Sequence, residues 1–174
     1  MNLKNPIGIF LISLLVVSCS VAFEEKNIGD QISIALPSHM DELDLGIPEA
    51  LLQYGNSNEE LYIAILKENP KDLEVKGIMN IESYSDMYIS GIEQTVTNAI
   101  ISQVSNGIEV QNGMQTITYE VDGIVPENGL GIYYLIKFYK SKTAYYYVSN
   151  WTMSNFKDDH IFDMKRITNS IKEL

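Results

Sequence analysis

The chain has one cysteine, Cys19, which ends a short apolar segment near the N-terminus. Lys4 precedes this segment, which runs from Ile7 to Val17 and is followed by Ser18. A basic start, an apolar run of roughly 7–15 residues and small residues at its exit are typical of a secretory signal peptide. The run is too short for the roughly 20 apolar residues that cross a bilayer as a helix. We therefore expect cleavage before Cys19, whose thiol is the only one in the chain that could be modified covalently.

The four residues Val16-Val17-Ser18-Cys19 resemble the lipobox of bacterial lipoproteins. This resemblance implies that Cys19 receives a diacylglyceryl group, that residues 1–18 are removed, and that the new amine is acylated in turn. Two or three acyl chains, palmitate among them, would hold the protein stably at a membrane surface. Ser20 stands where an Asp favours retention in the inner membrane, so we expect the outer membrane, with the domain facing the periplasm or the cell surface.

Acidic residues outnumber basic ones, 23 Asp and Glu against 12 Lys and Arg, which gives a formal net charge of −11. This charge opposes binding to nucleic acid, which depends on Lys and Arg contacts to phosphate. With Cys19 lipidated, the chain can form no disulfide, so its stability must come from a hydrophobic core. We expect three regions: the signal peptide (1–18), a lipidated tether (19–27) and a single domain (28–174).

The first half of this domain predicts a strand, a hairpin and a helix. Apolar residues alternate with small or polar ones over 32–36 and end at Pro37, as in a strand. The apolar runs 50–55 and 61–67 are separated by Gly-Asn-Ser-Asn, which is typical of a hairpin turn. Ser83 and Asp86 then match a capping box, and helical spacing of apolar residues predicts a helix over 84–103. We expect Gly91 to let that helix approach a sheet closely.

The second half predicts three long strands and a final helix. Residues 115–121, 131–139 and 144–151 alternate in hydrophobicity and are joined by short connections, so they should form an antiparallel meander. Ser154 is expected to cap the last helix, whose inward stripe comprises Ile161, Met164, Ile167 or Thr168, and Ile171. The element order predicts an α+β fold with a central antiparallel sheet packed by helices.

This order of elements resembles the PsbP/DcrB-like family. The resemblance rests on an opening strand that ends in ALPSHM, the hairpin YGNSNEELYIAIL, a helix, three long strands and the closing helix FDMKRITNSIKEL. It implies an α/β/α sandwich. Most members of that family are binding or assembly factors, so the resemblance also implies a non-enzymatic role.

The aromatic residues of the last strands are the main candidates for a binding surface. Tyr133 and Tyr139 share a face of one strand, and Tyr145, Tyr147 and Trp151 share a face of the next. Both faces of these strands are apolar or aromatic, so a face left without helices would present rings to a protein partner or a glycan. The commoner alternative is that the tyrosines pack in cross-strand pairs and under loops.

The two histidines and the polar loops predict no metal site. His39 lies in an acidic loop with Asp41, Glu42 and Asp44, but zinc would require more His or Cys, and the spacing is not that of a calcium loop. The turn at 56–60 carries Asn and Glu, as turn chemistry alone requires. We expect His160 to be exposed in the last helix.

The sequence contains no nucleophile elbow, no His-Glu-x-x-His pair and no phosphate- or dinucleotide-binding glycine loop. We therefore expect a protein that is not an enzyme and that needs no cofactor. The leading hypothesis is a membrane-anchored lipoprotein that binds or helps to assemble a protein of the bacterial envelope. The alternatives are a small-ligand or metal-ion-binding module and a hydrolase that acts on an envelope polymer through two carboxyl groups.

Overall fold

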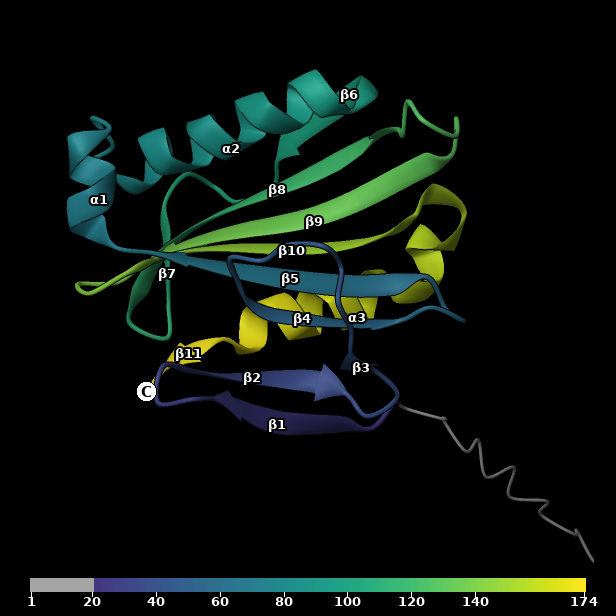
Figure 1. Cartoon of the computed structure of the whole chain (residues 1–174), viewed down its shortest axis with the longest axis horizontal. Coiled ribbons are helices and arrows are strands. Elements are labelled where there is room, and N and C mark those ends of the chain that lie inside the picture. The colour runs from purple at the N-terminus through teal and green to yellow at the C-terminus, as the bar shows by residue number, and fades with distance from the viewer. Residues whose placement is uncertain (1–20) are drawn as a thin grey trace, which may run out of the picture.

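A computed structural model describes residues 21–174, so the expected signal peptide and Cys19 lie outside the described residues (Figure 1). Its main feature is an eight-stranded sheet in the order β3-β4-β5-β10-β9-β8-β6, with the short β7 also paired to β8. All neighbouring strands are antiparallel. The strands are β3 (Asp41–Glu42), β4 (Ala50–Asn56), β5 (Leu61–Glu68), β6 (Thr97–Gln103), β7 (Glu109–Gln111), β8 (Met114–Ile124), β9 (Gly131–Lys140) and β10 (Tyr145–Met153). The predicted hairpin and the predicted meander are both present.

A second, smaller sheet joins the two ends of the described chain. It consists of β1 (Phe23–Ile28), β2 (Ile32–Pro37) and β11 (Lys172–Glu173), with β2 in the centre. The tether expected over 19–27 is therefore wrong from Phe23 onward, because these residues pair with β2 in regular antiparallel register. The strand was not predicted because Glu24, Glu25 and Lys26 give this segment no alternating apolar pattern. The start of the strand is held in place by a contact of the Phe23 ring with the Arg166 guanidinium, which lies 3.9 Å from the ring centroid.

Two long helices cover opposite faces of the main sheet. Helix α2 (Ile81–Thr95) packs on β6, β8 and β9, and α3 (Lys157–Ser170) packs on β9, β10 and β2, so that it lies between the two sheets (Figure 1). A short helix, α1 (Pro70–Val75), and a 3₁₀ turn, η1 (Ser154–Phe156), complete the fold. No helix within residues 21–174 has the length and apolar character needed to span a membrane.

The predicted helix 84–103 is correct only in its first half. The helix begins at Ile81 because Asn80 caps it: the Ser83 backbone N–H donates to Asn80 Oδ1 at 2.8 Å, and Ser83 occupies the third helical position of a true capping box. After Thr95 the chain turns into β6, which pairs with β8. Val96, Thr97 and the isoleucines that follow are β-branched and favour a strand, while their spacing also fits a helix.

The last helix is also capped differently from the prediction. Ser154 lies in η1, and no side chain caps α3 at its N-cap residue Phe156. Its inward stripe is confirmed, since Met164, Ile167, Thr168 and Ile171 are buried. His160 is buried as well, contrary to expectation, because its Nε2 lies 2.7 Å from the backbone carbonyl oxygen of Glu59.

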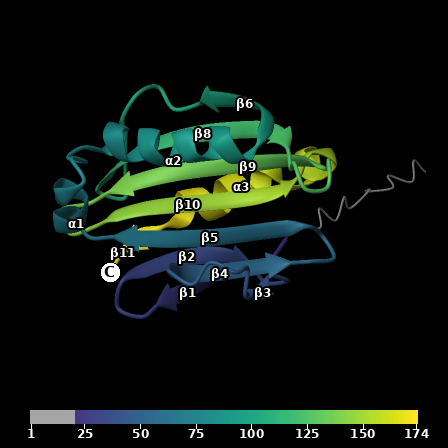
Figure 2. The same ribbon diagram turned by 45° about the horizontal axis from the view of Figure 1, so that its top comes forward.

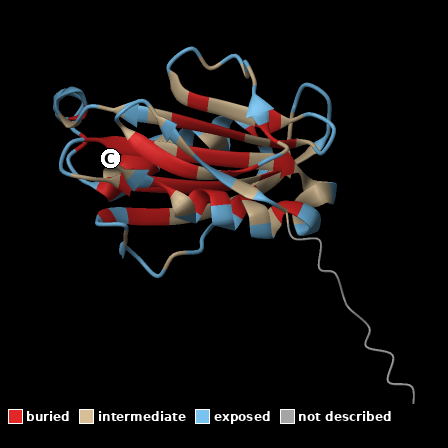
Figure 3. Cartoon of the chain, turned by 90° about the horizontal axis from the view of Figure 1, so that it is seen from below, coloured by how far each residue is buried: buried red, intermediate tan, exposed pale blue. Residues whose placement is uncertain are grey.

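The hydrophobic core has one part on each face of the main sheet. The part under α2 contains Tyr84, Phe138 and Tyr145, and the part between the two sheets contains Tyr139, Tyr146 and the stripe of α3. Buried residues follow the middle of the long strands, while exposed ones concentrate in the connections (Figure 3).

Candidate functional site

The five aromatic residues predicted as a partner surface lie on two opposite faces of the main sheet. In the β9–β10 register, Tyr139 pairs with Tyr146 and Phe138 pairs with Tyr147. Paired residues point to the same face, so Tyr133 and Tyr139 lie on the α3 side, while Tyr145, Tyr147 and Trp151 lie on the α2 side. The five predicted residues therefore do not form one surface, because the register between β9 and β10 decides which of their residues share a face.

Three of these five residues belong to the core. Tyr133 and Tyr139 are fully buried, and the Tyr139 hydroxyl donates to the Thr168 carbonyl near the end of α3. Tyr145 is 2% exposed and packs on Tyr84 of α2, with ring centroids 4.9 Å apart. The rings of these three tyrosines pack between the sheet and its helices, so they are not accessible to a partner.

The other two predicted residues belong to a half-exposed group that we call the aromatic shelf. It consists of Tyr62 on β5, Tyr134 on β9, and Tyr147 and Trp151 on β10, all of intermediate exposure. Tyr62 stacks on Trp151 at 5.7 Å between centroids, and Tyr134 is tilted against the same indole at 6.3 Å. Tyr147 stacks almost flat on Tyr88 of α2, at 4.3 Å. The aromatic shelf thus begins at the edge of the sheet area that α2 covers and extends from there toward β5.

The shelf is open because α2 covers only part of its face. Figure 2 shows α2 over β8 and β9, with β10 and β5 beyond it. A hollow of about 240 Å³ lies on this uncovered part. Apart from Ser149, it is lined by apolar or aromatic residues: Ile47, Ala64, Leu66, Tyr134, Tyr147 and Trp151. A second hollow, of about 160 Å³, lies between Trp151 and Leu130.

The phenols of the shelf are neutral hydrogen-bonding groups at physiological pH. Burial raises the pKa of Tyr147 to about 12 and also raises the pKa of Tyr134. Burial, and then the hydrogen bond from its hydroxyl to the Glu60 carboxylate at 3.0 Å, raise the pKa of Tyr62. The shelf therefore offers flat apolar rings with hydroxyl groups at their edges, which suits binding better than acid–base chemistry.

Two members of the shelf, Tyr62 and Tyr134, were missed in the sequence analysis. Tyr62 stands directly opposite Trp151 in the β5–β10 pairing. The predicted hairpin contained Tyr62, but the pairing of its second strand, β5, with β10 joins distant parts of the sequence. Local sequence pattern does not reveal such a pairing.

The polar loops discussed above have ordinary structural roles. His39 Nε2 lies 3.1 Å from the Glu59 carboxylate, and Asn56 Oδ1 accepts the backbone N–H of Asn58 at 3.0 Å, as in an Asx turn. Within the described part of the chain, no three His, Cys, Asp or Glu side chains are grouped as metal ligands would be.

Comparison with known proteins reveals similarity in structure only. No protein-family model and no curated protein matches the sequence. The fold is similar to that of cyanobacterial PsbP (CyanoP) from Synechocystis, with a TM-score of 0.62 and 9% identity over 94% of this chain and 99% of that one. It is also similar to LpqN of Mycobacterium tuberculosis, described as involved in cell envelope biogenesis, with a TM-score of 0.53 and 11% identity over 88% of this chain and 91% of that one.

A third structure, the Pseudomonas aeruginosa protein of unknown function PA94, matches with a TM-score of 0.48 and 9% identity over 82% of this chain and 91% of that one. The similarity to CyanoP extends over almost the whole of both chains. The described chain thus has a PsbP-like α+β fold, as the sequence predicted.

Proposed function

We propose that this protein is a lipoprotein, anchored in the cell envelope through Cys19, whose PsbP-like domain binds a protein partner there without catalysis. Three observations support this proposal. The residues Val16-Val17-Ser18-Cys19 match a lipobox, the domain carries a half-exposed aromatic shelf, and LpqN, which shares the fold, is involved in cell envelope biogenesis.

The observation that carries the binding role is the apolar hollow beside Trp151. A glycan would need many polar groups around the aromatic platform, whereas the side chains that line this hollow offer only the Ser149 hydroxyl, two phenols and one indole N–H for hydrogen bonding. Its volume of about 240 Å³ could hold one large apolar side chain. Large apolar side chains seated in such pockets are typical anchors of protein–protein interfaces. A protein with an exposed aliphatic or aromatic side chain is therefore the partner that we propose.

Site-specific photo-crosslinking in envelopes would test this proposal. We expect a photoreactive phenylalanine analogue at Tyr147 to form a covalent adduct with one defined partner, and the same analogue at Phe162 to form none. Phe162 is a matched control because it is 82% exposed and lies on α3, on the opposite side of the sheet. Trp151→Ala should reduce the adduct at residue 147, since truncating a central aromatic anchor typically costs at least about 2 kcal/mol, or roughly thirtyfold in affinity.

Thermal unfolding of Trp151→Ala and of the two proteins that carry the analogue at residue 147 or 162 would show whether they remain folded. An equal adduct from residues 147 and 162, or an adduct that Trp151→Ala leaves unchanged, would contradict the proposed surface.

A further inference from the structure

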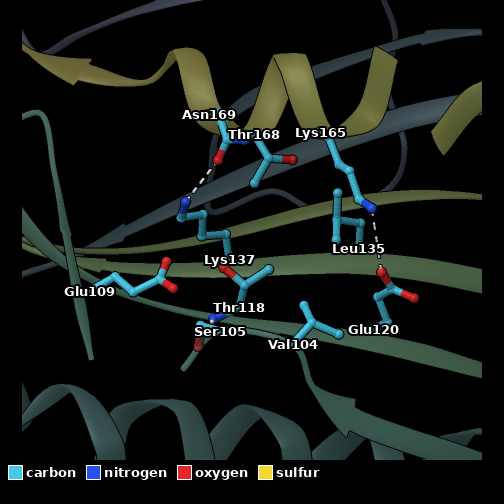
Figure 4. Close-up of a pocket in the computed structure, with 10 residues that line it drawn as sticks. All are labelled: Val104, Ser105, Glu109, Thr118, Glu120, Leu135, Lys137, Lys165, Thr168 and Asn169. Atoms are coloured by element: carbon cyan, nitrogen blue, oxygen red, sulfur yellow. Dashed lines mark hydrogen bonds and ion pairs between the residues drawn. The ribbon is translucent and has the colours of Figure 1, made fainter. Parts of the chain in front are cut away.

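A third hollow lies on the opposite face of the main sheet, between α3 and strands β7, β8 and β9. Its volume is about 250 Å³, and Lys137 of β9 projects into it from the sheet (Figure 4). Thr168 and Asn169 of α3 border it from above, while Val104 and Leu135 supply apolar surface. No residue of the aromatic shelf lines it, so the two sites are separate.

Lys137 is an unusual residue for such a position, because a lysine that is only 4% exposed rarely lacks an ion partner. Its ammonium group donates hydrogen bonds to Gln111 Oε1 and, at 2.8 Å, to Asn169 Oδ1, both of which are neutral amide oxygens. Among residues 21–174, no carboxylate oxygen lies within 4.0 Å of this ammonium. An ammonium has three N–H donors, so one is left beyond the two amides.

The charge on Lys137 is therefore incompletely compensated. Burial lowers the pKa of Lys137, and the negative charge of Glu109 partly opposes this by raising it. A buried charge without an ion partner is costly, and a counter-charge that enters the site lowers that cost. An anionic ligand group would supply what the protein lacks at this point.

The other charges around the hollow limit the ligand to a single negative charge. Glu120 lies between two lysines, with its carboxylate 3.7 Å from Lys157 Nζ and 4.0 Å from Lys165 Nζ. Lys165 remains 54% exposed at the rim. The carboxylates of Glu109 and Glu120 line the same hollow and would repel a dianion such as sulfate. A monoanion beside Lys137 would meet an ammonium whose charge is only partly compensated and would be repelled less than a dianion.

We propose that this hollow binds a small carboxylate-bearing molecule. Its carboxylate would accept the free N–H of Lys137, and its short carbon chain would lie on Leu135 and Val104. The hollow's volume limits the ligand to a short-chain acid or to the C-terminal residue of a peptide, which share this chemistry. The proposal is independent of the aromatic shelf and of the anchor at Cys19.

NMR titration of the full-length protein in detergent would test it with matched probes. Sodium propionate should shift the backbone amide signals of Thr118, Lys137 and Asn169 saturably, whereas propylamine hydrochloride, of similar size and opposite charge, should not. Alanylalanine, titrated in parallel, separates the two sources: tighter binding of the dipeptide indicates a peptide C-terminus, and tighter binding of propionate indicates a free acid. Sodium sulfate should bind more weakly than either.

Two variants and one control complete the experiment. Lys137→Met keeps the unbranched side chain up to the ε carbon but lacks the ammonium, and it should weaken carboxylate binding at least tenfold, because it removes a charge-assisted hydrogen bond. Lys142→Met, an exposed lysine in the β9–β10 turn, should leave the binding unchanged. Val104→Trp fills the hollow from a residue that is 49% exposed and should also block binding, which keeps the test valid if Lys137→Met does not fold. Absence of saturable shifts at tens of millimolar propionate and dipeptide, or equal affinity for sulfate, would overturn the proposal.

Discussion

Tyr133 and Tyr139 are both buried tyrosines of β9, but their hydroxyl groups have different surroundings. Both are fully buried, both lie on β9, and both face the α3 side of the sheet. The Tyr139 hydroxyl donates to the Thr168 carbonyl, whereas the Tyr133 hydroxyl has no hydrogen-bond partner in the described part of the chain. The Tyr133 ring does carry the Lys157 ammonium, 4.1 Å from its centroid. We therefore expect only the ring of Tyr133 to contribute to stability, whereas both the ring and the hydroxyl of Tyr139 should contribute.

The pair gives a residue-scale prediction about stability. Tyr139→Phe should lower the free energy of unfolding by about 1 kcal/mol or more, because it leaves the buried Thr168 carbonyl without this donor. Tyr133→Phe should be neutral or stabilising by up to about 1 kcal/mol, since it removes a buried hydroxyl without a partner and retains the ring under Lys157. Urea unfolding of both variants beside the wild type measures the difference. Equal losses in the two variants would show that the hydroxyl environments are not distinct.

At the scale of elements, local pattern predicted those parts of the fold that local chemistry determines. The strands of the meander and the inward stripe of α3 follow from periods of two and 3.6 residues. The boundary between α2 and β6 did not follow, because Val96, Ala99 and Ile100 have helical spacing although β-branched residues favour a strand. What decides it is the pairing of β6 with β8, a contact with a distant segment. Strand β1 was missed for a similar reason, since its partner β2, not its own charged sequence, defines it.

Replacing either of two glycines by alanine should change the free energy of unfolding, but in opposite directions. Gly91 was expected to allow close packing of α2, but a Cβ at this position would have no atom within 4 Å apart from the neighbouring backbone of its own helix. Gly91→Ala should therefore raise the free energy of unfolding by about 0.5–1 kcal/mol through helix propensity alone. Gly123 on β8 is different, because a Cβ there would lie 2.2 Å from Val96 Cγ1 and 3.2 Å from the Thr97 carbonyl oxygen. Gly123→Ala should destabilise by about 1–3 kcal/mol, as overpacking does.

Thermal unfolding monitored by circular dichroism would place the two alanine variants on opposite sides of the wild type. A loss of stability in Gly91→Ala would mean that α2 has a close neighbour at that point after all.

For the molecule as a whole, the candidate site was only partly predictable. Aromatic strands indicated a surface, and Tyr147 and Trp151 do belong to the shelf. The sequence could not show that Tyr133 and Tyr139 face the other way, because register between strands depends on the turn and on the whole sheet. Nor could it reveal Lys137 as a buried ammonium, since its surroundings come from β7 and α3, which are distant in sequence.

The proposed anchor gives a prediction at the same scale. Mass spectrometry of the protein purified from membranes should find an N-terminus at Cys19 that carries acyl chains, and an alkyne-labelled palmitate should be incorporated. Cys19→Ala should abolish the label and release the domain from the membrane, because each buried methylene contributes about 0.8 kcal/mol to anchoring. Ser20→Ala is the matched control and should be labelled normally. A mass that matches an unprocessed start at Met1 would refute the anchor.

The early start of β1 has a consequence for where such an anchored domain could act. Only three residues separate Cys19 from Phe23, the first residue of β1. Four residue steps span at most about 14 Å when fully extended, so the folded domain would stand almost directly on the lipid headgroups. Residues of β1 could extend this connection only by detaching from β2, which would break the strand pairing and the hydrogen bond from Ser33 Oγ to the Glu25 carboxylate at 2.9 Å. With so little reach, the aromatic shelf would meet partners that are themselves embedded in, or lie flat against, the same membrane.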